Sequence, residues 1–189
     1  MIILSGLGNP GREYDGTRHN LGFEVIDSLH KNYGFPDFKK KFDGLFAKCN
    51  ILGKEVAIFK PQSFMNISGT PIKKISQFFK INYQENLYII HDDLDMEFLK
   101  VRIKKTGGHG GHNGIRDIIK NIGNDFNRIK IGIKNNLLIE KNILPSDFVL
   151  TKFSKSEVKS FCEFKSIFSK NLNLILNKKL SLLINNLNI

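Results

Sequence analysis

Short apolar runs that end at turn residues alternate along this chain with segments whose apolar residues recur every three or four positions. Residues 1–5 (MIILS) and 86–91 (NLYIIH) are apolar runs typical of buried strands, and residues 98–103 are a third candidate. Residues 128–133 (RIKIGI) alternate between polar and apolar, as a strand with one buried face does. Within residues 45–60, LFAKCNI and EVAIFK flank a Leu-Gly-Lys turn and predict a hairpin.

Helical spacing occupies the segments between these strands. One helix is predicted over residues 20–33, and Gly34 follows it where a left-handed cap residue usually stands. Thr70 and Pro71 are a typical N-cap and first helical residue, so a second helix is expected to begin there and to end at about residue 80. Its start could also lie one turn earlier. A third helical segment covers residues 115–121.

The last forty residues also predict helices, because apolar residues recur there at intervals of three or four: Phe161, Phe164, Phe168, Leu172 and Ile175. Residues 134–150 have no periodicity and predict a loop. Strands that alternate with helices, together with one hairpin, predict an α/β fold. We therefore expect a single domain over residues 1–189, with a mixed, mostly parallel twisted sheet flanked by helices and a helical C-terminal segment.

Charge is the feature of the composition that narrows the function. The 29 Lys and Arg residues outnumber the 18 Asp and Glu residues and give a formal net charge of +11, which favours an anionic partner, above all nucleic acid. A bias of the coding sequence could explain why most of the basic residues are Lys and not Arg. It does not readily explain why basic residues outnumber acidic ones by eleven. Two distant cysteines, the lack of a leader-like N-terminus and the lack of a long apolar run predict a cytoplasmic protein without a membrane span.

Residues 6–11 (GLGNPG) match the G-x-G-x-x-G pattern of dinucleotide-binding folds, but their context does not fit that function. The next helix is expected only from about Asn20, whereas a pyrophosphate site needs a helix that begins at the third glycine. Pro10 removes a backbone N–H, and Asp27, near the spacing of a ribose-binding acid, would lie in mid-helix. The sequence therefore predicts no dinucleotide cofactor and leaves a long polar loop after the first strand.

Four segments that follow strands or open helices are rich in polar side chains, and they could converge on one cleft at the carboxyl edge of the sheet. The first loop carries Asn9, Tyr14, Arg18, His19 and Asn20. The other three are FMNISG (64–69), HDDLD (91–95) and GGHGGHNG (107–114).

Two kinds of hydrolytic chemistry fit these segments. A metal site could use His91, Asp92, Asp93, Asp95, His109 and His112, although no pair of them has a helix-face spacing. A hydrolase without metal could use His19, whose ordinary pKa is near neutrality, as general base and Asp92 to orient it. Neither Ser nor Cys stands in a nucleophile signature, so water would be the nucleophile. Solvated loop histidines and turn-forming aspartates are the purely structural alternative.

The longer motifs around these residues carry a resemblance to one family. GLGNPGREYDGTRHNLGF, KPQSFMNISG, HDDLD and GGHGGHNGIRDI resemble the successive signatures of the bacterial-type peptidyl-tRNA hydrolases, from Met1 to about Ser154. The C-terminal segment matches only in being helical and basic. The resemblance implies hydrolysis of the ester that joins a peptide to tRNA, which frees the tRNA for translation. It also implies a monomer that uses no metal and no cofactor.

The resemblance implies roles for the residues that stand at matching positions. His19 falls on the catalytic base, Asp92 on the carboxylate that supports it, and Asn9 on the position that favours N-blocked over free aminoacyl groups. The positions that bind the substrate or its tRNA phosphates fall on Tyr14, Phe64, Asn66, Asn113, Lys104, Arg128 and Lys130. Asn9→Ala is accordingly expected to damage discrimination while leaving the fold intact.

The sequence departs from the family pattern at three places. The loop KKTGGHGG lacks a third glycine or an Arg-Ser pattern, and Lys130 stands where Arg is more usual and cannot form its bidentate contact. The stretch after Ile133 lacks the usual Arg-Pro or His-Pro, so the conformation of residues 134–145 is not predicted. A metal-dependent nucleic-acid hydrolase and a non-catalytic RNA-binding protein are the alternative functions.

Overall fold

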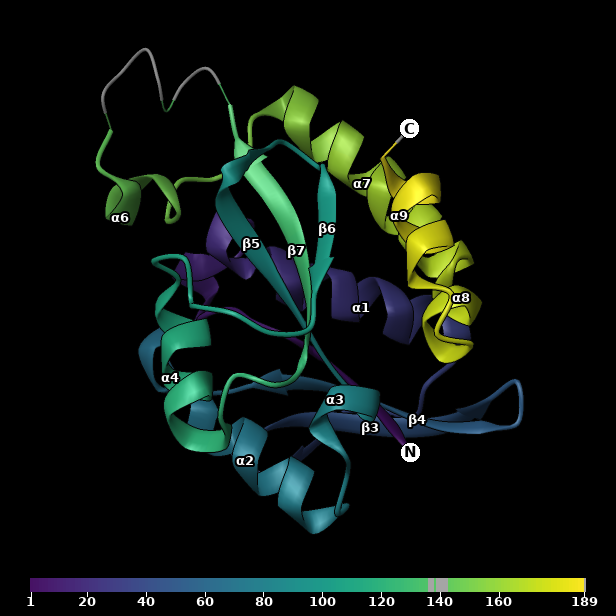
Figure 1. The fold of residues 1–189 in the computed structure, drawn as a ribbon. Helices are drawn as coiled ribbons and strands as arrows, with labels where there is room; N and C mark the ends of the chain where they lie inside the picture. Colours follow the sequence, from purple (N-terminus) through teal and green to yellow (C-terminus); the bar gives the residue numbers. More distant parts are fainter. Residues whose placement is uncertain (136–137, 139–142, 189) are drawn as a thin grey trace.

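A computed structural model of the chain describes residues 1–135, 138 and 143–188, and it shows one mixed sheet with helices on both faces (Figure 1). The strand order is β2-β3-β4-β1-β5-β7-β6. The four strands β4, β1, β5 and β7 are parallel, whereas β2 and β3 on one side and β6 on the other are antiparallel to their neighbours. The strands are β1 (Ile2–Gly6), β2 (Lys39–Lys41), β3 (Gly44–Ile51), β4 (Lys54–Pro61), β5 (Leu87–Glu97), β6 (Val101–Lys104) and β7 (Asn127–Lys134). The predicted fold class is confirmed.

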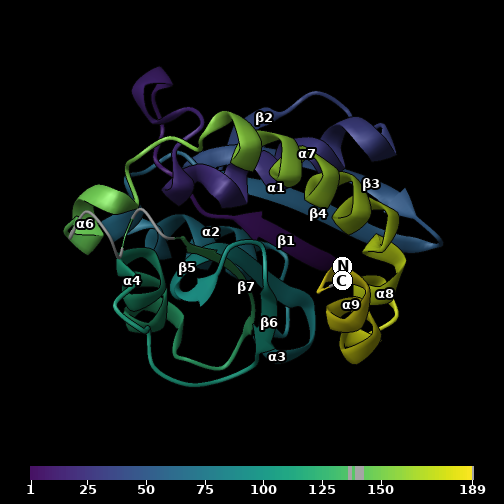
Figure 2. The ribbon, with the colours of Figure 1, turned by 90° about the horizontal axis from the view of Figure 1, so that it is seen from above.

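The described helices are distributed over both faces of the sheet. The α-helices are α1 (Leu21–Tyr33), α2 (Gly69–Phe78), α3 (Tyr83–Asn86), α4 (Asn113–Ile122), α6 (Pro145–Phe148), α7 (Lys155–Lys170), α8 (Leu172–Leu176) and α9 (Leu180–Leu187). Short 3-10 helices cover η1 (Arg12–Tyr14), η2 (Arg18–Asn20) and η3 (Met65–Ile67). Seen from above, α1 and α7 lie on one side of the sheet and α2 and α4 on the other (Figure 2). None of the described helices combines the length and the apolar character that a membrane crossing requires.

Strand β1 has a core on each side, which explains why its sequence is apolar throughout. Leu4 packs into the cluster under α1 and α7, whereas Ile3 packs into the cluster under α2 and α4. The periodic C-terminal residues, from Phe161 to Ile175, are buried in the first cluster, as their spacing predicts. The central strands are therefore fixed from both faces, and their carboxyl ends form a rigid edge.

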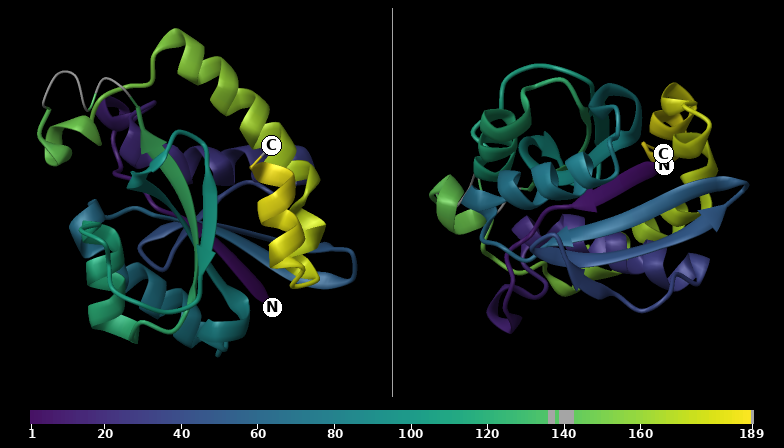
Figure 3. Two further views of the ribbon diagram at one scale, coloured as in Figure 1. Left: turned by 45° about the horizontal axis from the view of Figure 1, so that its top comes forward. Right: turned by 90° about the horizontal axis from the view of Figure 1, so that it is seen from below.

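The C-terminal helices follow one flank of the molecule and cover its antiparallel edge. Helix α7 leads into α8 and α9, and α9 lies beside β6 (Figures 1 and 3). The Asn188 side chain accepts a hydrogen bond from the N–H of Val101 at 2.6 Å and donates one to its carbonyl at 3.0 Å. This amide pairs with the edge strand much as a neighbouring strand would, and so occupies an edge that would otherwise be open.

Several predicted bounds are confirmed. Helix α1 ends at Tyr33, and Gly34 is left-handed with φ 61°. The β3–β4 hairpin turns at Leu52 and Gly53, and helix α4 covers the predicted segment with two more residues at its start. In the predicted loop 134–150, β7 reaches Lys134 and α6 forms near the end, while residues 136–137 and 139–142 lie outside the described part.

Other bounds are wrong for identifiable reasons. Helix α2 begins at Gly69, earlier than a Thr70 cap would place it, as the alternative start allowed. The Asp117 carboxylate of α4 accepts from the N–H of Gly69 at 2.7 Å and takes the place of a local cap. Strand β5 continues past His91 to Glu97 because it keeps pairing with β7 across a register shift. Strand β6 begins only at Val101, and β2 was not predicted because three lysines carry no apolar pattern.

Candidate active site

The polar segments meet at the carboxyl edge of the sheet because adjacent parallel strands end there. Strands β1 and β5 are neighbours, and the N–H of Leu7 donates to the carbonyl of Ile90 at 2.9 Å beyond their ladder. A Cβ on Gly6 would lie 2.0 Å from the carbonyl oxygen of Gly22, so only glycine lets α1 approach the strand end this closely. Gly6 thus serves the close packing of α1 against the end of β1, and the chain just before α1 carries His19 to the end of β5.

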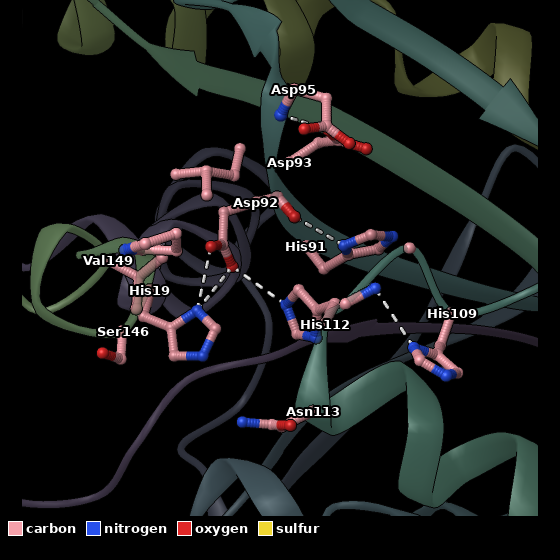
Figure 4. Close-up of a pocket in the computed structure, with 14 residues that line it drawn as sticks. His19, His91, Asp92, Asp93, Asp95, His109, His112, Asn113, Ser146 and Val149 are labelled. Atoms are coloured by element: carbon pink, nitrogen blue, oxygen red, sulfur yellow. Dashed lines mark hydrogen bonds and ion pairs between the residues drawn. The ribbon is translucent and has the colours of Figure 1, made fainter. Parts of the chain in front are cut away.

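His19 and Asp92 form a buried pair at the centre of the site. The Nδ1 of His19 lies 2.9 and 3.0 Å from the two carboxylate oxygens of Asp92, and both side chains are almost fully buried. The Nε2 of His19 points away from Asp92, on the side where Asn113 lies (Figure 4), and makes no hydrogen bond with the described residues. Asp92 therefore holds the proton on Nδ1 and leaves Nε2 with a free lone pair, as a general base requires.

His112 donates a second hydrogen bond to Asp92, which sequence reasoning considered only as a metal ligand. Its Nε2 lies 3.1 Å from Oδ1 of Asp92, approaching from another side than His19 (Figure 4). Its Nδ1 accepts from the backbone N–H of Ile115 at 3.3 Å, where His112 is the N-cap of α4. Because Nδ1 is an acceptor, the proton of neutral His112 must sit on Nε2, facing the carboxylate.

A third histidine packs behind this pair. The Nδ1 of His91 lies 2.7 Å from the backbone carbonyl of Asp92, and its ring meets that of His112 nearly edge-on, with centroids 4.7 Å apart. Its neutral form therefore carries the proton on Nδ1. The ring packs against that of His112 and bonds the backbone of Asp92, so His91 contacts both partners of the hydrogen bond between His112 and Asp92.

Burial and the shared carboxylate separate the protonation states of these groups. Burial alone would lower the pKa of His19, but the charge and hydrogen bond of Asp92 outweigh it and raise the pKa above its ordinary value. Burial lowers the pKa of His112 and, more strongly, that of His91, so both are neutral at pH 7. Burial would raise the pKa of Asp92, yet the two histidines hold it well below its usual range. The group around Asp92 thus combines an ionised carboxylate with two histidines whose pKa values are lowered and one, His19, whose pKa is raised.

Two hollows meet at His19. The first, the histidine cavity, has a volume of about 250 Å³ and is lined by His19, His91, Asp92, Asp93, Leu94, Asp95, His109, Gly110, Gly111, His112, Asn113, Pro145, Ser146 and Val149. The second, the amide cavity, is lined by Asn9, His19, Phe64, Met65, Asn66, Asn113, Ser146, Val149 and Leu150. His19, Asn113, Ser146 and Val149 line both, so they mark the boundary where a substrate could cross from one to the other.

Asn9 has a fixed orientation in the amide cavity. Its Oδ1 accepts from the N–H of Met65 at 2.8 Å, while its backbone is held by the side chain of Asn20 through two hydrogen bonds of 2.8 and 2.9 Å. With Oδ1 engaged, its Nδ2 is a donor that no described residue accepts from. The sequence identified Asn9 but not the supporting roles of Asn20 and Met65.

The remaining predicted substrate residues surround this cavity. Asn66 is exposed on η3, and Asn113 begins α4 with its Oδ1 accepting from Arg116 at 2.9 Å. Phe64 is half exposed and meets Tyr14 edge-on, with ring centroids 6.2 Å apart. These side chains come from three different segments, which the fold brings to one rim.

The six residues of the alternative metal site all line the histidine cavity, but their donor atoms do not form one close group. Among the described residues, the close group of possible metal donors is His19, Asp92 and His112. Both histidines already point at the carboxylate with N–H groups, so a cation would have to replace two hydrogen bonds. Asp93 instead pairs with Lys130, and His109 accepts from the N–H of Gly111 at 3.1 Å.

Known protein families, individual sequences and solved structures that resemble this chain all point to one family. The model of the family described as peptidyl-tRNA hydrolase matches residues 3–189. The chain belongs to the peptidyl-tRNA hydrolase family. The match also covers the C-terminal helices, beyond Ser154, where the motifs that carry the resemblance end.

Individual members of the peptidyl-tRNA hydrolase family resemble the chain over most of their length. Those of Lactobacillus johnsonii and Fusobacterium nucleatum are 44% and 42% identical over 160 and 163 residues, which is 84% and 86% of this chain and 84% and 83% of theirs. That of Neorickettsia sennetsu is 38% identical over 176 residues, 93% of this chain and 88% of its own. A crystal structure of the hydrolase from Acinetobacter baumannii superposes with a TM-score of 0.88 at 36% identity, covering 100% of this chain and 94% of that one.

The basic residues that the resemblance to peptidyl-tRNA hydrolases assigned to tRNA do not all face solvent. Lys104 is exposed, and Lys130 is half-buried beside Asp93. Arg128 is buried: its guanidinium donates to the carbonyls of Gly107, Gly108 and Asn124, at 2.7, 2.8 and 3.3 Å. The donors of Arg128 thus hold the glycine loop that leads to His112 in this structure, and its contact with tRNA stays a prediction.

Proposed function

We propose that this chain hydrolyses the ester between peptide and tRNA with a water molecule activated by His19. The Nε2 of His19 takes a proton from water as the oxygen attacks the ester carbonyl carbon. The tetrahedral intermediate then breaks its bond to the ribose oxygen, which receives the proton from the imidazolium. The products are a peptide with a free carboxyl group and a tRNA with a free terminal hydroxyl. The observation that carries this mechanism is the Asp92 carboxylate, which accepts from His19 and leaves only Nε2 free.

The two cavities around His19 give the substrate a direction. The amide cavity offers Asn9 and Asn66, whose side chains suit peptide groups. The histidine cavity shares Asp93, Asp95 and Gly110 with a groove that also contains Lys104 and Lys130. We therefore place the peptide in the amide cavity and the tRNA end in the histidine cavity, with its phosphates toward the groove. Tyr14 and Phe64 would border the peptide, and Asn113, on the boundary, would help position water or the ester.

Replacing Asn9 by aspartate is expected to reduce discrimination between N-blocked and free aminoacyl-tRNA by about ten- to hundred-fold. Aspartate keeps the oxygen that accepts from Met65 but replaces the free donor with a second oxygen, which repels a peptide carbonyl and attracts an ammonium group. The measurement is kcat/KM for N-acetylaminoacyl-tRNA against aminoacyl-tRNA. Asn9→Ala is a weaker test than the sequence suggests, because it also leaves the Met65 N–H unpaired. An unchanged ratio in folded Asn9→Asp would contradict this role.

Lys104 and Lys130 are proposed to contact tRNA phosphates, and the lysines of the C-terminal segment to add to the same basic surface. Lys104→Ala is expected to raise KM several-fold at low salt, leave kcat unchanged and lower the slope of log KM against log salt by about one unit. Lys31→Ala on α1, which removes an exposed charge outside both cavities, is the matched control. Equal effects of the two variants would mean that Lys104 acts only through the net charge of the protein and does not contact a phosphate.

The decisive experiment measures hydrolysis of N-acetylaminoacyl-tRNA in EDTA by the wild type and by His19→Ala. A metal-dependent hydrolase would lose activity in EDTA, and a non-catalytic RNA-binding protein would have none to lose. Our proposal requires activity that survives EDTA and depends on His19.

We further propose that residues 1–189 form a single domain that acts as a monomer in the cytoplasm. Support comes from the site, whose proposed residues all belong to this one chain and meet around one sheet, and from the family's substrate, which belongs to translation. A dimeric mass in solution at assay concentrations would contradict the monomer.

A further inference from the structure

Arg18, the residue before His19, is buried in a site built for its guanidinium. The side chain is 1% exposed and lies against the rings of Phe148 and Phe153, with its central carbon 4.5 and 5.0 Å from their centroids. Its two terminal nitrogens donate to the two carboxylate oxygens of Glu157, both at 2.9 Å, and its Nε donates to Oγ1 of Thr151 at 3.1 Å. The edge of the planar guanidinium is thus hydrogen-bonded to Glu157 and Thr151, and its faces lie against two aromatic rings. A lysine side chain could not make this set of contacts.

Glu157 is held as firmly as its partner. Its Oε1 also accepts from the side chain of Asn135 at 2.7 Å, and its Oε2 from the backbone N–H of Ser154 at 2.8 Å, closing the capping box of α7. Burial would raise its pKa, but hydrogen bonds from Arg18, Ser154 and Asn135 and the charge of Arg18 lower it to about 2. Glu157 is therefore ionised at any pH at which the enzyme is assayed.

The backbone beside this pair carries His19. The N–H of His19 donates to the carbonyl of Val149 at 2.8 Å, and the N–H of Arg18 donates to that of Thr151 at 3.0 Å. Thr17 forms a further bridge to Lys152. His19 lies in a 3-10 turn outside the sheet, so these contacts to residues 149–152 are what fixes its backbone. Val149 also lines both cavities, so the same contacts fix the wall against which His19 stands.

We propose that the Arg18–Glu157 ion pair positions His19 for catalysis by locking η2 to the segment that follows α6. The proposal rests on the function proposed above, in which His19 is the base. The pair touches no reacting atom, so Arg18 and Glu157 are positioning residues. Their effect is on kcat, because a displacement of about 1 Å in a catalytic group can cost about a hundredfold in rate.

Stability alone does not account for this ion pair. Helix α7 is already anchored by Phe161, Phe164 and Phe168 in the core. A buried ion pair adds little stability compared with apolar residues of the same volume, but it accepts only one geometry. Its place directly beside His19, and its reach across 139 residues of sequence, favour a role in fixing the position of the base.

The test is Glu157→Gln, with Glu163→Gln as the matched control. Glutamine keeps the shape of Glu157 but replaces one acceptor oxygen by an NH₂ group that faces a donor. Glu163 lies on the same helix, is exposed and makes no ion pair among the described residues, so its replacement is expected to change nothing. We expect kcat of Glu157→Gln on N-acetylaminoacyl-tRNA to fall about ten- to hundredfold, with KM within about twofold.

A second readout separates positioning from folding. The acid limb of kcat/KM reports the pKa of His19, which Asp92 raises; His112 also faces the ring, and Asp93, Asp95 and His109 line the same cavity. If the ion pair holds His19 against Asp92, the midpoint of this limb moves to lower pH in Glu157→Gln. A smaller folded fraction would lower the rate without moving the midpoint.

Each outcome decides the proposal. A folded Glu157→Gln enzyme with wild-type kcat, or with a lower kcat and an unchanged midpoint, overturns it. If Glu157→Gln does not fold, Thr151→Val decides, because it removes only the hydrogen bond to Nε of Arg18 and one to Phe148. We expect a several-fold loss in kcat and a shift in the same direction, and wild-type behaviour overturns the proposal. Activity retained by His19→Ala would instead disprove the base itself.

Discussion

His19→Ala is expected to lose about 10²–10⁴-fold in kcat for N-acetylaminoacyl-tRNA, the range that general-base assistance supplies. KM is expected to change little, because Nε2 is proposed to act on water and the two cavities proposed for the substrate keep their other residues. The measurement is single-turnover hydrolysis in EDTA, with tRNA binding determined separately. Wild-type turnover by a folded His19→Ala enzyme would contradict the mechanism.

His30→Ala provides the control for the loss of an imidazole. His30 lies near the end of α1, where its ring stacks on Phe38 and faces the carbonyl of Pro36 rather than the cavities. Its replacement is expected to leave kcat unchanged at a temperature at which the protein is folded. A comparable loss in both histidine variants would point to general destabilisation of the fold.

The strands and the main helices could be predicted because their patterns are local. The run from Met1 to Ser5 is mostly apolar on both faces, and residues 128–133 alternate between polar and apolar. The sequence of each strand therefore indicates by itself which of its faces are buried. Strand β2 could not be predicted, because it consists of three exposed lysines whose backbone pairs with β3 and whose side chains show no apolar pattern. The sequence could not place the first residue of α2, because the side chain that caps it belongs to Asp117, 48 residues away.

The site divides in the same way. Motif and residue chemistry suffice to select His19, Asp92 and Asn9 as candidates, since each stands in a segment dense in polar groups. The second hydrogen bond to Asp92, from His112, depends on how the glycine loop before α4 packs against β5. The pairing of Arg18 with Glu157 depends on the path of the chain through the C-terminal segment, for which no local pattern exists.

Arg128 shows that charge alone does not reveal which basic side chains are buried. It alternates with Lys130 along β7 in a sequence that resembles a basic surface, and only the fold places the glycine loop over its guanidinium. The same loop lacks apolar residues, so its sequence alone could not indicate that a buried arginine holds it. Net charge predicts the kind of partner, whereas the contacts of each side chain decide which charges remain free to bind it.

Asp92→Asn is expected to lower kcat about 10³–10⁴-fold, more than the removal of one negative charge near a base would suggest. Asp92 accepts N–H groups from two histidines, and an amide offers one oxygen and one NH₂. His112 cannot change its tautomer without losing the hydrogen bond from Ile115, so it keeps the oxygen. The NH₂ group then faces Nδ1 of His19 and drives the proton onto Nε2, the atom that must accept it from water.

The pH profile of the same variant has a definite sign. His19 is active as base when neutral, so kcat/KM rises with pH through its pKa, which Asp92 raises above the ordinary value. Without that charge, burial lowers the pKa unopposed, and the acid limb of Asp92→Asn is expected to move to lower pH than in the wild type. An unmoved limb, or turnover within tenfold of the wild type, would remove Asp92 from the mechanism.

A double variant tests the tautomer directly. With His112→Phe added to Asp92→Asn, the amide oxygen has one donor left to serve, and it can turn to Nδ1 of His19. The proton then returns to Nδ1, Nε2 regains its lone pair, and part of the lost kcat is expected to return although the charge is still missing. Recovery of rate by a second substitution in a buried site cannot come from stability, so it would identify competition for one acceptor as the cause. A double variant slower than Asp92→Asn would contradict that competition.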